Sequence, residues 1–105
     1  MGAPADNRAM TDSPLTIRRA DISDLGALAH LAALDSSEPP AGDSLLAEVG
    51  HELWAAVEIS SGRAIADPFR PSGDLVELLR FRAQRMRAEA SGQRRRFASL
   101  LPRAA

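Results

Sequence analysis

The pattern of apolar and polar residues changes near residue 15. Residues 1–14 are small, polar and proline-containing with no hydrophobic period, so we expect a flexible leader there. Over 15–18 apolar and polar side chains alternate, which is typical of a half-buried strand. Asp21 with Asp24 three positions later matches a helix start, and the leucines that follow at helical spacing predict a helix over 22–35.

The middle of the chain predicts an antiparallel meander. Segment 36–42 contains two prolines and a glycine, so it can neither continue a helix nor donate fully to a sheet, and we expect a loop. Three β-rich runs joined by glycine-containing turns follow it, over residues 45–49, 53–60 and 63–66.

Alternation along the second of these strands leaves apolar side chains on both of its faces. One face is expected to carry Leu53, Ala55, Val57 and Ile59, and the other Trp54 and Ala56 with Glu58. Because both faces carry apolar side chains, we expect helices to cover both faces of the sheet. The fold class is therefore α/β of the α+β type, with a small, mainly antiparallel sheet of about four strands and a helix on each face.

A long helix is predicted near the end of the chain. Asp74 with Glu77 three positions later forms a capping-box pattern for a helix that runs to about Ala90. The apolar stripe of this helix consists of Leu75, Leu78, Leu79, Ala83 and Met86. Gly92 is expected to stop this helix, after which the basic segment either frays as a helix or stays disordered. This divides the chain into the leader, a domain over 15–91 and a basic tail over 92–105.

The amino-acid composition excludes several kinds of functional site. The chain has no cysteine, which excludes a disulfide framework, a cysteine-ligated zinc site and a cysteine nucleophile, and it makes a reducing cytoplasm the expected compartment. The first part of the chain lacks a signal-peptide core, and no apolar run approaches the roughly 20 residues that span a bilayer.

All thirteen basic residues are arginine, and seven of them lie between Arg80 and Arg96. The run Arg94 to Phe97 resembles a small nucleic-acid or anionic-membrane patch, but a solvated terminus is the ordinary alternative and the net charge of -1 gives no global attraction. Arg82 lies close to the apolar stripe of the long helix. It is expected either to extend its stem along the stripe edge or to mark an ion pair or a partner contact.

Residues 15–90 resemble the N-terminal half of the GNAT-type N-acetyltransferases. Segments 15–20 and 46–50 are similar to the family's first two strands, and 70–75, with leucines at 78 and 79, is similar to its coenzyme A loop. Within that loop Arg70 and Gly73 match the family signature. The resemblance implies a GNAT-like fold, acetyl-CoA as cofactor, Arg70 and Gly73 as cofactor-binding residues, and transfer of an acetyl group to an amine.

The sequence also departs from that family. Pro71 removes an N–H donor, Asp74 adds a carboxylate that repels phosphate, and Leu75 stands where a small residue would let phosphate approach. The family continues into further strands and often supplies a tyrosine acid, whereas this chain has no tyrosine. We therefore expect a shortened relative with weak acyl-CoA binding that does not turn over alone, unless a partner completes the site.

The remaining candidate groups have ordinary alternatives. Glu48 and Glu58 are candidate general bases on adjacent strands, although exposed strand glutamates are common. His30 and His51 are far apart in sequence, so we expect no metal site. The competing function is a non-catalytic protein-interaction or self-association module that uses an exposed strand edge at 63–66. Under this reading the arginine-rich C-terminus is a minor nucleic-acid or membrane contact.

Overall fold

Strands that follow one another in the chain are also neighbours in the sheet. A helical connection joins β1 to β2, and turns join the later strands. The computed structural model describes residues 13–100, and all strand pairs in it are antiparallel, in the order β1-β2-β3-β4. The elements are β1 (Leu15–Arg19), a short 3-10 helix η1 (Ile22–Asp24), α2 (Leu25–Leu34), β2 (Ser44–Val49), β3 (Glu52–Glu58), β4 (Ala64–Ala66) and α3 (Gly73–Leu100).

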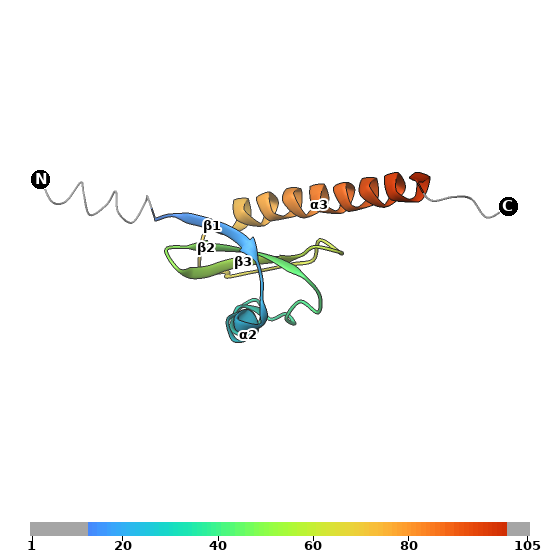
Figure 1. The fold of residues 1–105 in the computed structure, drawn as a ribbon. Helices are drawn as coiled ribbons and strands as arrows, with labels where there is room; N and C mark the ends of the chain where they lie inside the picture. The colour runs from blue at the N-terminus through green and yellow to red at the C-terminus, as the bar shows by residue number, and fades with distance from the viewer. Residues whose placement is uncertain (1–12, 101–105) are drawn as a thin grey trace, which may run out of the picture.

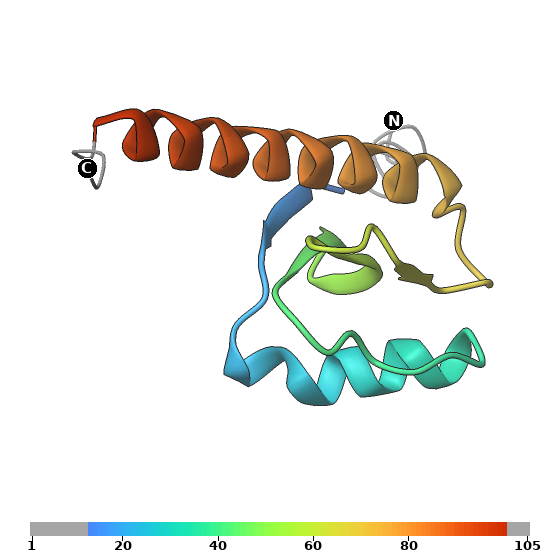
Figure 2. The same cartoon turned by 90° about the vertical axis from the view of Figure 1, so that its right-hand side faces the viewer.

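The two helices lie on opposite faces of the sheet, α3 above it and α2 below it in Figure 2. Two buried clusters follow from this arrangement. The cluster under α3 contains Leu45, Ala47, Ala55, Val57, Ile59, Leu79 and Ala83. The cluster over α2 contains Leu28, Leu31, Ala32, Leu46, Ala56 and Ile65. The predicted fold class, a small antiparallel sheet of four strands with a helix on each face, is confirmed.

The predicted start of the first helix and the predicted turn between β2 and β3 are both present. Asp21 accepts the Ser23 N–H while Asp24 accepts the Asp21 N–H, so the capping box forms, although it opens a 3-10 turn ahead of α2. Gly50 and His51 have φ values of 56° and 74°, the left-handed pair that a two-residue hairpin of this twist requires.

One prediction about β3 is wrong, because a bulge interrupts its alternation. Ala47 pairs with Ala55 but Glu48 pairs with Leu53, so Trp54 is an extra residue in β3. The bulge moves Leu53 away from the face of Ala55, and its side chain packs instead against the cluster over α2. Strict alternation had placed it under α3.

The predicted limits of the last helix are also wrong. The helix begins at Gly73, so Asp74 lies in its first turn, and the Val76 N–H donates to the Ser72 carbonyl at 3.0 Å. It continues through Gly92 to Leu100, because a helical glycine costs only about 1 kcal/mol and the alanine, glutamine and arginine around it favour helix. The boundary between the predicted domain and tail therefore falls inside α3; the expected leader before Ser13 lies outside the described residues.

Neither helix is centred on the sheet. Both pack on β3 and β4, and α3 reaches β2 as well, so β1 lies to one side of both. The C-terminal part of α3 runs out beyond the sheet in both views (Figures 1 and 2). Within residues 13–100 no helix combines the length and apolar character needed to cross a bilayer. Because β2 is buried between the two clusters, β1 is the strand that the helices leave open.

Candidate functional site

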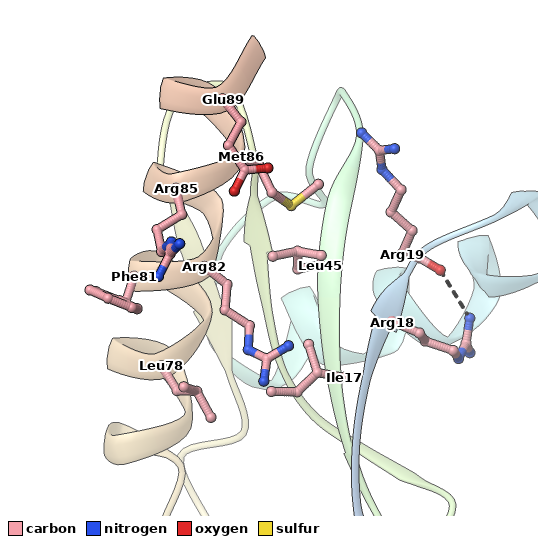
Figure 3. Close-up of a pocket in the computed structure, with 10 residues that line it drawn as sticks. All are labelled: Ile17, Arg18, Arg19, Leu45, Leu78, Phe81, Arg82, Arg85, Met86 and Glu89. Atoms are coloured by element: carbon pink, nitrogen blue, oxygen red, sulfur yellow. Dashed lines mark hydrogen bonds between the residues drawn. The ribbon is translucent and has the colours of Figure 1, made fainter. Parts of the chain in front are cut away.

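A groove runs between β1 and α3, and we call it the β1–α3 groove (Figure 3). Its volume is about 630 Å³. The apolar side chains that line it are Ile17, Leu45, Leu78, Phe81 and Met86, and the charged residues are Arg18, Arg19, Arg82, Arg85 and Glu89. Because Leu45 lies on β2, the groove has a strand as its floor, with α3 and β1 as its two walls.

Strand alternation decides which residues of β1 reach this groove. Leu15, Ile17 and Arg19 point to the α3 side, because Ile17 packs against the cluster under α3 and side chains repeat every second residue. Phe81 on α3 is 58% exposed and Leu15 is 44% exposed. Large apolar side chains thus stay open to solvent beside the strand that α3 does not cover.

The arginines of α3 fall into two groups with different surroundings. On one flank Arg80 donates to the Gly62 carbonyl and Arg87 donates to the Ile59 carbonyl, so these side chains fasten α3 to the loops after β3. On the groove flank neither Arg82 nor Arg85 has a hydrogen-bond or ion-pair partner among the described residues. In Figure 3 the Arg82 guanidinium lies over the groove close to Ile17.

The groove is electropositive. Arg19, Arg82 and Arg85 line it together with one acid, Glu89, and the remaining charged lining residue, Arg18, is bound to two carboxylates on the other face of β1. On the opposite wall Arg19 lies 3.9 Å from Asp43, but both side chains are largely exposed, so this pair is screened and weak. A second hollow of about 490 Å³ shares Arg19 and Met86 with the groove and extends it under α3.

The other face of β1 is polar and already paired. The Arg18 guanidinium donates to both carboxylate oxygens of Asp24, at 2.7 and 2.8 Å, and its Nε donates to Glu48 at 2.9 Å. These two carboxylates raise the pKa of Arg18. The Arg18 hydrogen bonds, followed by the Asp21 N–H, lower the pKa of buried Asp24 to about 2. This cluster ties β1, β2 and η1 together.

The predicted cofactor residues Arg70 and Gly73 have different surroundings. The Arg70 guanidinium lies 3.0 Å from Glu52 and 5.4 Å from the centre of the Trp54 ring, so it turns toward the α2 side of the sheet. Gly73 begins α3, where a side chain at its position would meet nothing within 4 Å. Among the described residues Asp74 makes no hydrogen bond to the first turn of α3.

The two candidate bases do not come together. Glu58 pairs with Ser44 at one end of the β2–β3 ladder, whereas Glu48 pairs with Leu53 nearer the other end. Glu48 is held by Arg18. Glu58 accepts the N–H groups of Ala41 and Gly42, and the Ser61 hydroxyl followed by the Gly42 N–H lowers its pKa. Both carboxylates therefore hold parts of the fold together, and the lowered pKa of Glu58 makes it a weaker base.

The histidines and the buried polar side chains are the remaining chemical groups. His30 and His51 are both exposed, and among the described residues no three His, Asp or Glu side chains gather closely enough to hold a metal ion. In the same part of the chain every buried side-chain nitrogen or oxygen has a hydrogen-bond partner.

The predicted strand edge at β4 is present but short. Its Ala66 N–H already donates to the Asp35 carboxylate at 3.1 Å, which covers part of that edge. The other edge of the sheet is β1, with five residues, and it borders the groove. The arginines 94–96 of α3 are exposed, and Arg94 lines the second hollow. The Phe97 side chain lies outside the described residues.

Comparison with known proteins adds no relative to this picture: no protein-family model, no curated protein and no solved structure matches the chain. The resemblance to N-acetyltransferases remains a prediction from sequence. The groove was not predicted, because its two walls, residues 17–19 and 78–89, lie far apart in the sequence. Its trace in the sequence is the position of Arg82 beside the apolar stripe of α3, together with the apolar residues Leu15 and Ile17 at alternate positions of β1.

Proposed function

We propose that this chain is a non-catalytic interaction module that holds an acidic segment of a partner protein in the β1–α3 groove. The single observation that carries the proposal is the pair Arg82 and Arg85, which stand over an apolar groove with no acidic partner among the described residues. Exposed apolar surface rimmed by charge is typical of binding surfaces, and arginine is enriched at them. The cytoplasm remains the proposed compartment.

Charge complementarity selects the partner. In a two-fold symmetric dimer through this groove, Arg82 and Arg85 of one copy would face the same arginines of the other, and such like-charge juxtaposition costs on the order of several kcal/mol. An acidic segment instead neutralises the groove while its apolar residues cover Phe81 and Ile17. The proposal therefore commits to a different protein with acidic and apolar residues.

We expect an unbiased peptide library selected on this protein to return sequences rich in Asp and Glu. Arg82→Glu should weaken their binding by about tenfold or more, whereas Arg95→Glu, with the same change in charge and outside both hollows, should have a small effect. Affinities by fluorescence anisotropy, measured with sedimentation of the protein alone, test this. Equal losses in the two variants, or a dimer that Arg82→Glu dissociates, would contradict the proposal.

A second candidate is weak acyl-CoA binding at the start of α3, as the family resemblance implies. The observation that favours it is the open space around Gly73 at a helix start, where N–H groups attract anions. We expect calorimetry with acetyl-CoA to detect binding no tighter than millimolar, because Pro71 lacks an N–H and Asp74 repels phosphate. Arg70→Ala should abolish that heat if Arg70 leaves Glu52 to bind phosphate, and unchanged heat would remove the role of Arg70. No heat in either protein at millimolar acetyl-CoA would remove this candidate.

A further inference from the structure

Resting on the interaction function proposed above, we infer that the bound segment is an amphipathic α-helix with acidic flanks, which lies beside α3 as the second helix of its layer. The first argument is the width of the sheet. Strands lie about 4.8 Å apart, and neighbouring helices pack about 8 to 10 Å apart. Since α3 packs mainly on β3, a helix placed next to it stands two strands away, above β1.

The surface at that position is apolar on one face of the sheet only. On the α3 side, β1 presents Leu15 and Ile17 with the exposed Arg19 at its end, whereas on the α2 side it presents Arg18 bound to two carboxylates. A helix on the α3 side would bury the exposed parts of Leu15 and Phe81, for a gain of about 25 cal/mol for each Å² removed from water. An apolar helix face with acidic residues at its flank would therefore stabilise the α3 side of β1.

The flank of α3 that faces the groove has the spacing of a helix–helix seam. Leu78, Arg82, Arg85 and Glu89 line the groove at intervals of four, three and four residues, with Phe81 beside Arg82. This alternation of three and four is the spacing at which one helix packs along another. With two arginines at the centre of the seam, the neighbouring helix needs glutamate or aspartate facing them and apolar residues facing Phe81.

Strand addition to β1 is the alternative binding mode, and the edge of β1 disfavours it. The Ala20 N–H donates to the Ser44 carbonyl, and the Pro14 carbonyl accepts from the Gly50 N–H. The backbone groups of the even-numbered residues of β1 therefore bond to β2, and those of the odd-numbered residues point outward from the sheet edge. Of those outward groups the Arg19 carbonyl is already contacted by the Arg18 guanidinium, at 3.3 Å. A charged side chain across the edge opposes pairing with a further strand.

Three synthetic peptides test the inference on the full chain. The first has leucines at helical spacing flanked by glutamates; the second has lysine in place of each glutamate; the third is the first with a central proline. We expect the glutamate peptide to bind most tightly and to gain helicity by circular dichroism, and the proline peptide to lose at least about tenfold in affinity. The double variant Arg82→Glu, Arg85→Glu should reverse the preference and bind the lysine peptide.

The outcomes separate this inference from the function on which it rests. If the glutamate and proline peptides bind equally, with no gain in helicity, the bound segment is extended and the inference is overturned. The proposed function, binding of an acidic segment in the groove, then still stands. If no acidic peptide prefers the wild type over Arg82→Glu, both fall. Arg95→Glu is the matched control, because Arg95 lies on the same helix outside the groove; its thermal unfolding shows whether a charge reversal on α3 disturbs the fold.

Discussion

Leu79→Ala is expected to lower the free energy of unfolding by about 2 to 5 kcal/mol, the largest effect of any single change considered. The Leu79 side chain is fully buried and belongs to the cluster that joins α3 to the sheet. Alanine there removes the apolar contact and leaves a cavity between helix and strands, which the small alanines at Ala47, Ala55 and Ala83 cannot fill. A domain of this size has only about 5 to 15 kcal/mol in total.

The control is Phe81→Ala, two residues along the same helix. Phe81 is the larger side chain, but it is 58% exposed, so its removal should cost below about 1 kcal/mol of stability. Urea unfolding of both variants measures the difference, and the proposed groove predicts that Phe81→Ala loses peptide affinity instead. If the two variants were equally stable, α3 would not be packed on the sheet through the face that Leu79 occupies.

The burial of Leu79 illustrates what the sequence could predict. Its place in an apolar stripe at helical spacing predicts a buried helix face, and the alternation around Ala55 and Val57 predicts a sheet covered on both sides; both predictions are confirmed. Leu53 was misplaced because a bulge changes the face of a residue without any change in residue type. Gly92 was misread because its neighbours outweigh the modest cost of a helical glycine.

The candidate site was harder to predict than the fold. The family motif points to Arg70 and Gly73, which are close in sequence, whereas the position of the groove depends on where α3 crosses the sheet. The helix lies over β3, with β2 and β4 on either side of it, and this leaves β1 beyond its flank. Arg82 showed only that a charge lay beside an apolar stripe; that Ile17 stands opposite it follows from the tertiary arrangement alone.

The protein is expected to lose stability between about pH 4 and pH 2 through Asp24, in addition to any general acid effect. The pKa of Asp24 is lowered from 3.8 to about 2 by Arg18, so the folded state favours the ionised carboxylate more than the unfolded chain does. This contribution is fully present above the unfolded pKa and disappears as the pH falls through the folded one. It amounts to about 1 to 2 kcal/mol, less than the full shift implies, because water reaches Arg18.

The variant Asp24→Asn isolates the contribution that the ionised Asp24 makes to stability. Urea unfolding of both proteins at a series of pH values should give stabilities that differ most at neutral pH and converge as the pH falls through about 2, the folded pKa at which Asp24 of the wild type is half protonated. Arg18→Met should show the larger loss at neutral pH, about 1 to 3 kcal/mol, since it leaves buried Asp24 without its cation and Glu48 without its partner. A wild-type curve parallel to that of Asp24→Asn from pH 7 to pH 2 would show that the ion pair does not stabilise the fold.

Arg18 also connects stability to the proposed binding surface. Its guanidinium holds β1 against β2 and η1 from the α2 side, and the same strand presents Ile17 and Arg19 to the groove on the other side. We therefore expect Arg18→Met to weaken peptide binding at neutral pH although its side chain points away from α3. Arg82→Glu should weaken binding without the loss of stability, and that contrast separates a residue that positions β1 from one that contacts the partner.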